Sequence, residues 1–244
     1  MHSWEWLPVE QEIVRTMTLR VRLVTAEQVA RGWFASSDDP TAAAQAVLAR
    51  LEQGSLLTRR VLEAHPILEM RRPLVAWSVG SPAPTEADWD SVAAKARSRW
   101  DQDHVPVEVY SATKEAVSVC GAFLDSRHVK HSESTHDLHF TEVYLRYRHR
   151  APRLAARWLG EAAFPKLGFE IHRMKDPDAF IVSTGGVADR IVEFAGSYDA
   201  EHLRAFHDHC AGGATQRLAD QGWYASDSAL ARLYAPEGTG YELW

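Results

Sequence analysis

Apolar residues early in the chain recur at helical spacing, and the clearest case is the segment 40–53. Asp39 precedes this segment and can accept a hydrogen bond from its first free N–H groups, Pro40 suits the first helical position, and Gly54 suits the position just past the end. The apolar stripe consists of Ala44, Val47, Leu48 and Leu51. The pattern predicts an amphipathic helix that buries this stripe.

Two further helices and two strands are expected on either side of this segment. Residues 8–23 place apolar side chains near helical spacing, and Thr25 with Gln28 has the spacing of a capping box that opens another helix. Strand-like runs follow at 55–63 and 71–79, and the second of them alternates apolar and polar residues with a period of two. The pattern therefore predicts three helices followed by a β-hairpin.

Three helices and a hairpin form the element order of a winged helix-turn-helix, which we expect over residues 1–80. In such a domain the second helix of the motif enters the major groove of DNA and the wing contacts the backbone. Here the helix would offer polar side chains to base edges, and the wing would offer two arginine pairs to phosphates. The predicted contacts with double-stranded DNA are Thr41, Gln45, Arg50, Gln53, Arg59, Arg60, Arg71 and Arg72. The alternative is an adaptor whose winged helix contacts proteins and whose arginines face solvent.

The rest of the chain mixes helical and strand-like patterns, so the expected fold class is α+β. Residues 81–103 are predicted to be a linker helix, and residues 104–244 are predicted to be a separate α/β domain. In this domain, residues 136–152 have a helical pattern, and the final residues indicate a closing strand.

A predicted hairpin in this α/β domain brings two acids together. Its strands, 179–183 and 190–195, flank a Gly-Gly turn, and antiparallel pairing puts Asp178 and Glu193 on the same face of the sheet. Two carboxylates so placed can share a Mg²⁺ ion, which phosphodiester hydrolysis uses together with a nearby cation. The candidates for a third carboxylate, from a preceding element, are Glu142 and Glu161.

The Pro-Asp, the short β-branched run and the glutamate on the next strand resemble the metal-binding hairpin of the PD-(D/E)xK nuclease-like fold. This resemblance implies a restriction-endonuclease-like domain with Asp178 and Glu193 as metal ligands and a lysine two positions later, where this chain has Ala195. We therefore expect an inactive site. The alternative is a Mg²⁺-dependent DNA endonuclease in which Asp178, Glu193 and Lys175 are catalytic, with Lys175 or Arg204 supplying the relocated cation.

A wider resemblance runs along the second half of the chain. Its features, in order, are the His-Asp-Leu at His136, the Trp-x-x-Glu of Trp158 and Glu161, the Pro-Asp-Ala at Pro177, and a strand that ends in a glutamate before a helix. This series is similar to the replication-relaxation family of plasmid and mobile-element proteins, in which a winged helix precedes a nuclease-like domain. The resemblance implies a role in the replication, transfer or regulation of mobile DNA.

Composition narrows the class of protein. The net charge is −6, yet a local basic stripe is enough to bind phosphates. No apolar run approaches the roughly 18 residues that span a bilayer, and the acidic start does not resemble a secretory signal. Two cysteines, Cys120 and Cys210, make no disulfide framework. We expect a cytoplasmic homodimer that needs no small-molecule cofactor, with Mg²⁺ only if the nuclease-like site functions.

Twelve histidines raise the question of a zinc site. Zinc prefers four tetrahedral ligands, often in close pairs. His136 and His139 have usable spacing on a helix, whereas His207 and His209 do not share a helical face, and the chain has no CxxC. We therefore expect these histidines to face solvent or to cap backbone groups.

Overall fold

The computed structural model describes residues 5–120, 133–163, 177–222 and 233–244. The chain forms two compact units, and each unit is built from two separate stretches. Unit 1 comprises Met1–Glu69 and Asp103–Pro152, and unit 2 comprises Met70–Gln102 and Arg153–Trp244. This division differs from the predicted boundaries at residues 80 and 103, because the chain crosses from unit 1 into unit 2, returns, and crosses again.

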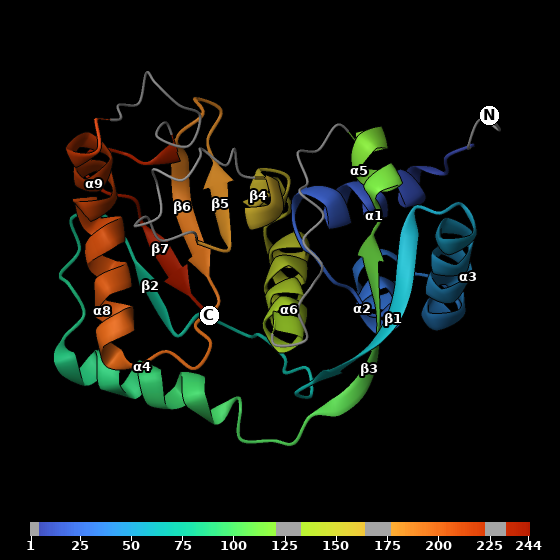
Figure 1. Cartoon of the computed structure of the whole chain (residues 1–244), viewed down its shortest axis with the longest axis horizontal. Coiled ribbons are helices and arrows are strands. Elements are labelled where there is room, and N and C mark those ends of the chain that lie inside the picture. Colours follow the sequence, from blue (N-terminus) through green and yellow to red (C-terminus); the bar gives the residue numbers. More distant parts are fainter. Residues whose placement is uncertain (1–4, 121–132, 164–176, 223–232) are drawn as a thin grey trace. The chain divides into compact units, whose positions relative to one another are not determined.

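Unit 1 combines helices with one antiparallel ladder (Figure 1). Its elements are α1 (Pro8–Leu19), α2 (Ala26–Trp33), α3 (Pro40–Gln53), β1 (Leu57–Ala64), β3 (Val105–Ala112), α5 (Lys114–Cys120) and α6 (Ser134–Arg150). The predicted start of α3 is confirmed, since the Asp39 side chain accepts a hydrogen bond from the N–H of Ala42 at 2.9 Å. The capping box of α2 is confirmed as well, because Thr25 and Gln28 each accept the other's backbone N–H.

The ladder of unit 1 corrects the predicted hairpin. β1 pairs with β3 over eight residues, and the strand at 75–77 does not pair with it. Pro73 lies inside the second run that was expected to pair, and proline cannot donate a backbone N–H to a ladder. The observed partner β3 contains a proline as well, Pro106, but near the end of the ladder opposite Glu63. The prediction of a wing formed by residues 55–63 and 71–79 is therefore wrong.

An isolated β-bridge adds one further contact to β3. Val24, in the connection between α1 and α2, forms an antiparallel bridge with Tyr110. The N–H of Tyr110 donates to the carbonyl of Val24 at 2.8 Å, and the reverse bond is 3.1 Å. The connection before α2 is thus fixed to the same sheet that follows α3.

Unit 2 is built around a mixed sheet with the strand order β2-β7-β6-β5-β4. Its elements are β2 (Val75–Trp77), α4 (Glu86–Ser98), α7 (Pro152–Ala155, at the boundary with unit 1), β4 (Trp158–Gly160), the 3₁₀ turn η2 (Glu161–Ala163), β5 (Ala179–Val182), β6 (Ala188–Glu193), α8 (Ala200–Asp208), the π-helical turn η4 (His209–Gly213), α9 (Ala214–Asp220) and β7 (Tyr241–Leu243). The closing strand predicted at the end of the chain is confirmed as β7, which lies parallel to β6 and antiparallel to β2.

The core of unit 2 joins this sheet to α4 and α8. Trp89 of α4 is almost fully buried, and it belongs to the same cluster as Leu203 of α8 and Ile191 of β6. Burying an aromatic side chain of this size contributes a few kcal/mol to stability. Residues 81–103, predicted to be a linker helix, do contain a helix, α4, but it packs into the core of unit 2.

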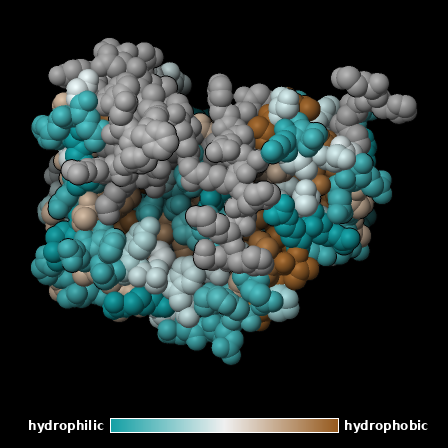
Figure 2. Space-filling model, viewed as in Figure 1, coloured by the Kyte–Doolittle hydropathy of each residue, from teal (hydrophilic) through white to brown (hydrophobic). Residues whose placement is uncertain are grey.

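The fold class is mixed α+β, as predicted. In the described ranges, no helix has both the length and the apolar character that crossing a membrane requires. On the face shown in Figure 2, hydrophilic residues cover much of the described surface, which agrees with apolar side chains gathering in the interiors.

Candidate functional site

The two acids of the predicted hairpin lie side by side in unit 2. β5 and β6 pair antiparallel with Ala179 opposite Val192, so Asp178, one residue before β5, stands opposite Glu193 at the end of β6. Residues opposite each other in such a pair project to the same face of the sheet. The predicted juxtaposition of Asp178 and Glu193 is therefore confirmed.

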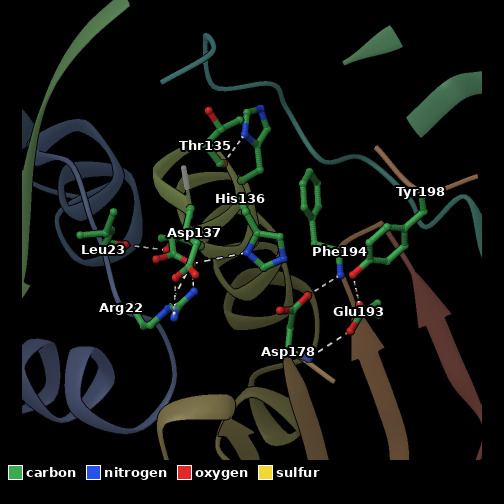
Figure 3. Close-up of polar contacts among 12 residues, drawn as sticks. Arg22, Leu23, Thr135, His136, Asp137, Asp178, Glu193, Phe194 and Tyr198 are labelled. Carbon is green, nitrogen blue, oxygen red and sulfur yellow. Dashed lines mark hydrogen bonds and ion pairs between the residues drawn. The ribbon is translucent and has the colours of Figure 1, made fainter. Parts of the chain in front are cut away.

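Each carboxylate is bound by groups of the protein itself (Figure 3). The N–H of Phe194 donates to Oδ2 of Asp178 at 2.7 Å, and the N–H of Asp178 donates to Oε2 of Glu193 at 3.1 Å. The hydroxyl of Tyr198 donates to Oε1 of Glu193 at 3.0 Å. The two acids thus cross-link the strands through reciprocal bonds from side chain to backbone.

The two carboxylates affect the pKa of the nearby Tyr198 hydroxyl. The charge of Glu193, followed by burial and by the charge of Asp178, raises the pKa of the Tyr198 hydroxyl far above its usual value. A raised pKa keeps the hydroxyl protonated, so Tyr198 acts as a hydrogen-bond donor to Glu193. Glu193 is 6 % exposed, and each of its two oxygens accepts a hydrogen bond.

The position where a nuclease would carry lysine lies in the core. Ala195 is fully buried, and it packs in the cluster that includes Leu203 and Phe206. Of the two predicted substitute cations, Lys175 lies outside the described residues. Arg204 forms an ion pair with Glu86 at the start of α4. Arg204 is therefore engaged in joining α8 to α4.

The candidates for a third carboxylate have different positions. Glu142 lies on α6 in unit 1, where Arg31 donates to both of its oxygens and Gln28 donates to Oε1. Glu161 follows β4 in unit 2, and its N–H donates to the carbonyl of Asp178 at 2.8 Å. Among the described residues, no group of three or more potential ligands is arranged to hold a metal ion.

The predicted DNA-reading helix, α3, leaves its polar side chains accessible in part. Thr41, Gln45 and Gln53 are exposed. Arg50 instead turns toward the N-terminal region of unit 1, where its Nε lies 3.2 Å from the buried carboxylate of Glu10 and its Nη2 donates to the carbonyl of Glu5. The structure therefore assigns Arg50 a contact with α1.

The four arginines predicted to form a wing are divided between the two units. Arg59 and Arg60 lie on β1, whereas Arg71 and Arg72 precede β2 in unit 2. The prediction that these two pairs face each other across one hairpin is wrong. Arg59 lies near Glu52 and Glu108, at 3.6 and 3.4 Å, while Arg60 is exposed.

The histidines predicted to be structural include several with clear partners. Nε2 of His139 accepts the N–H of Leu68 at 3.1 Å, and its Nδ1 lies 2.7 Å from the carbonyl of Thr135. Nδ1 of His207 lies 3.0 Å from the hydroxyl of Tyr241. The ring of His139 thus caps backbone groups, as expected.

Neither a protein-family model, nor a curated protein, nor a solved structure matches this chain. The replication-relaxation resemblance thus remains a prediction from the residues quoted for it.

Two contacts with the site were not predicted from the sequence. Tyr198 stands five residues after Glu193, in a run that looked like the start of a helix, and no spacing rule links a tyrosine to that glutamate. Arg99, the C-cap of α4, lies with its Cζ 5.3 Å from the ring centroid of Phe194. The position of Arg99 at the end of a predicted helix could be read from the sequence, but its contact with Phe194 could not.

Proposed function

We propose that unit 1 binds double-stranded DNA as a winged helix, with α3 in the major groove and the β1–β3 ladder beside the phosphate backbone. The connectivity carries this proposal: a helix, an isolated bridge residue at Val24, two helices, and then two paired strands of which the second also pairs with Val24. This order supports a winged helix whose wing strands are β1 and β3. Residues 65–104, between the two strands, include the part of the chain that enters unit 2.

The exposed side chains of α3 favour contact with the DNA phosphate backbone and allow only limited recognition of bases. Its exposed side chains include Gln45 and Gln53, which can hydrogen-bond to base edges, beside several alanines. Arg50 is bound to Glu10, whereas Arg60 of β1 is exposed and can contact phosphates. We therefore propose binding with modest sequence preference and strong dependence on salt.

We further propose that Asp178 and Glu193 act as a structural cross-link in an inactive nuclease-like unit. Their oxygens accept two backbone N–H groups and one hydroxyl. Mg²⁺ would compete with these donors for the same oxygens. A role in the maintenance of mobile DNA and a homodimeric state are proposals that rest on the resemblance described above.

The DNA proposal is tested by fluorescence anisotropy with a random duplex of about 20 bp over a range of salt concentrations. Arg60→Ala should lower the slope of log K against log salt by about 0.9, because one phosphate contact is lost. Gln45→Glu should weaken binding because it places a negative charge in the groove. The matched control is the pair Arg71→Ala and Arg72→Ala, which should leave binding unchanged. Equal losses from Arg60→Ala and from this control would contradict the proposed wing.

The endonuclease alternative has a separate test. Supercoiled plasmid is incubated with the protein and with Mg²⁺ or Mn²⁺, and nicked circles are quantified beside Asp178→Ala and Glu193→Ala. The proposed cross-link predicts no nicking above background. Nicking by the natural chain that both variants abolish would establish the alternative.

A further inference from the structure

The C-terminal end of α6 begins a run of positive charge that contains no acid. Residues 143–160 have neither aspartate nor glutamate, although the chain as a whole has 33 acidic against 27 basic side chains. The arginines of this run are Arg146, Arg148, Arg150, Arg153 and Arg157. A local concentration of arginine in an acidic chain is the charge pattern of a surface that binds phosphates.

Two of these arginines are bound within the protein. Both Nη atoms of Arg148 donate to the carboxylate of Glu12 on α1, and its Nε donates to the carbonyl of Gly32 at 2.9 Å. Nη1 of Arg157 donates to Oδ2 of Asp189 at 2.6 Å. These two side chains therefore have structural roles.

Arg146 and Arg150 differ from these two. They lie four residues apart on α6, a spacing that places both side chains on the same side of the helix. Arg150 is exposed and Arg146 is partly exposed. Neither forms an ion pair with a described residue, so both guanidinium groups are accessible to an anion.

The helix end does not account for these two charges. The carbonyl end of a helix carries about half a negative charge, which cations in the last turn stabilise, and Arg148 already lies in that turn. The acid one turn before Arg146 is Glu142, and Arg31 donates to both of its oxygens. The charges of Arg146 and Arg150 thus exceed what these groups offset.

The chemistry of this helix end favours the phosphate backbone of duplex DNA. A guanidinium offers N–H donors in one plane, which suits the oxygens of phosphate. Tyr144 and Tyr147 are buried, so they are not available to stack on the bases of a single strand. The apolar residues Val143 and Leu145 are buried as well, so this end of α6 has no apolar face for a membrane.

We propose that Arg146 and Arg150 form a second contact of unit 1 with the phosphate backbone of duplex DNA. The inference rests on the proposed binding of duplex by this chain, but it does not require the contacts proposed for α3 and β1. The contact reads no bases, and its contribution to affinity falls as the salt concentration rises.

The test is a salt titration of the full chain with a random duplex of about 20 bp, followed by fluorescence anisotropy. Arg146→Gln with Arg150→Gln should lower the slope of log K against log salt by about 1.8, because two phosphate contacts are lost. Lysine at both positions keeps the two charges and should preserve the slope. Arg150→Gln alone alters an exposed side chain and should lower the slope by about 0.9 even if the double variant does not fold.

The matched control is Lys95→Gln with Arg97→Gln, which removes two exposed cations from the last turn of α4. It changes the net charge by the same amount and should leave the slope unaltered. An unaltered slope in the folded Arg146→Gln, Arg150→Gln variant, or an equal fall in the control, would overturn the proposal.

The same titration separates this contact from the one proposed for β1. Added to Arg60→Ala, the two α6 substitutions should lower the slope by a further 1.8 or so. A fall caused by the α6 substitutions when Arg60→Ala has no effect would support the α6 contact and contradict the β1 contact. A fall caused by Arg60→Ala alone would contradict the α6 contact and leave the proposed function standing.

Discussion

Glu193 lies at the end of strand β6, and its hydrogen bonds distinguish a structural role from a metal-binding role. Tyr198 and the N–H of Asp178 both donate to it, while Asp178 in turn accepts from Phe194. In a metal site without its ion, neighbouring carboxylates repel each other because no donor or cation offsets their charges. Replacing one of them with a neutral side chain then stabilises the protein. A structural cross-link responds in the opposite way, because removing one acceptor leaves buried donors unpaired.

Glu193→Gln should therefore lower the free energy of unfolding by about 1–3 kcal/mol, measured by urea denaturation without divalent metal. Tyr198→Phe should be destabilising in the same range, since it removes the donor to Oε1. Glu237→Gln, at an exposed position, is the matched control and should be neutral. A stabilised Glu193→Gln protein would indicate repulsion between the acids and would argue for a metal site.

His207 should make stability depend on pH. It is 7 % exposed, and burial lowers the pKa of its imidazole below the ordinary value of 6.5, with a smaller opposing effect from Asp208. The unfolded chain then binds a proton at a higher pH than the folded protein, so stability falls as the pH drops through 6.5 and levels off below the folded pKa.

Urea unfolding between pH 8 and pH 5 measures this contribution. His207→Gln should flatten the profile relative to the natural chain. His149→Gln changes an exposed histidine and should leave the slope unaltered. A slope that His207→Gln does not change would assign the pH dependence to other groups.

Helices were more predictable than strand partners, because the signals for a helix lie within its own segment, whereas a strand's partner can lie far along the chain. The limits of α3 depend on Asp39, Pro40 and Gly54, which all lie within its own segment. The partner of β1 lies beyond residue 100, and nothing local distinguishes it from the nearer run at 71–79. Pro73 within the nearer run cannot donate to a ladder, but β3 itself contains Pro106 opposite Glu63, so the prolines did not decide between the two partners.

The ladder itself can be tested with an engineered disulfide. Thr58 lies opposite Ser111, and neither side chain is fully exposed or fully buried. Thr58→Cys with Ser111→Cys should form a disulfide on mild oxidation, because directly opposed residues of an antiparallel pair lie within disulfide range. The background is Cys120→Ser and Cys210→Ser, and formation is followed by the shift in mobility on a non-reducing gel.

Thr58→Cys alone, in the same background, is the control and should show no intramolecular shift. Failure of the double variant to form the disulfide under conditions that oxidise other close cysteine pairs would be inconsistent with the pairing of β1 and β3.

At the scale of the whole molecule, the chain passes between two units that local patterns could not separate. The hairpin with Asp178 and Glu193 could be predicted, because both strands and their turn lie within about 20 residues of each other. The placement of β2 and α4 in unit 2 could not, because β2 pairs with β7 and α4 packs against α8, both of which lie more than 100 residues later in the chain. For the same reason, the separation of Arg59 and Arg60 from Arg71 and Arg72 became visible only in the fold.

The central claim is that DNA contacts unit 1 through α3 and β1. Hydrogen–deuterium exchange of the full chain, followed by mass spectrometry with and without a random duplex at low salt, tests it most directly. We predict slower exchange in peptides that cover residues 40–53 and 57–64 when duplex is present. Unchanged exchange in both segments at saturating duplex, with protection confined to unit 2, would contradict the claim.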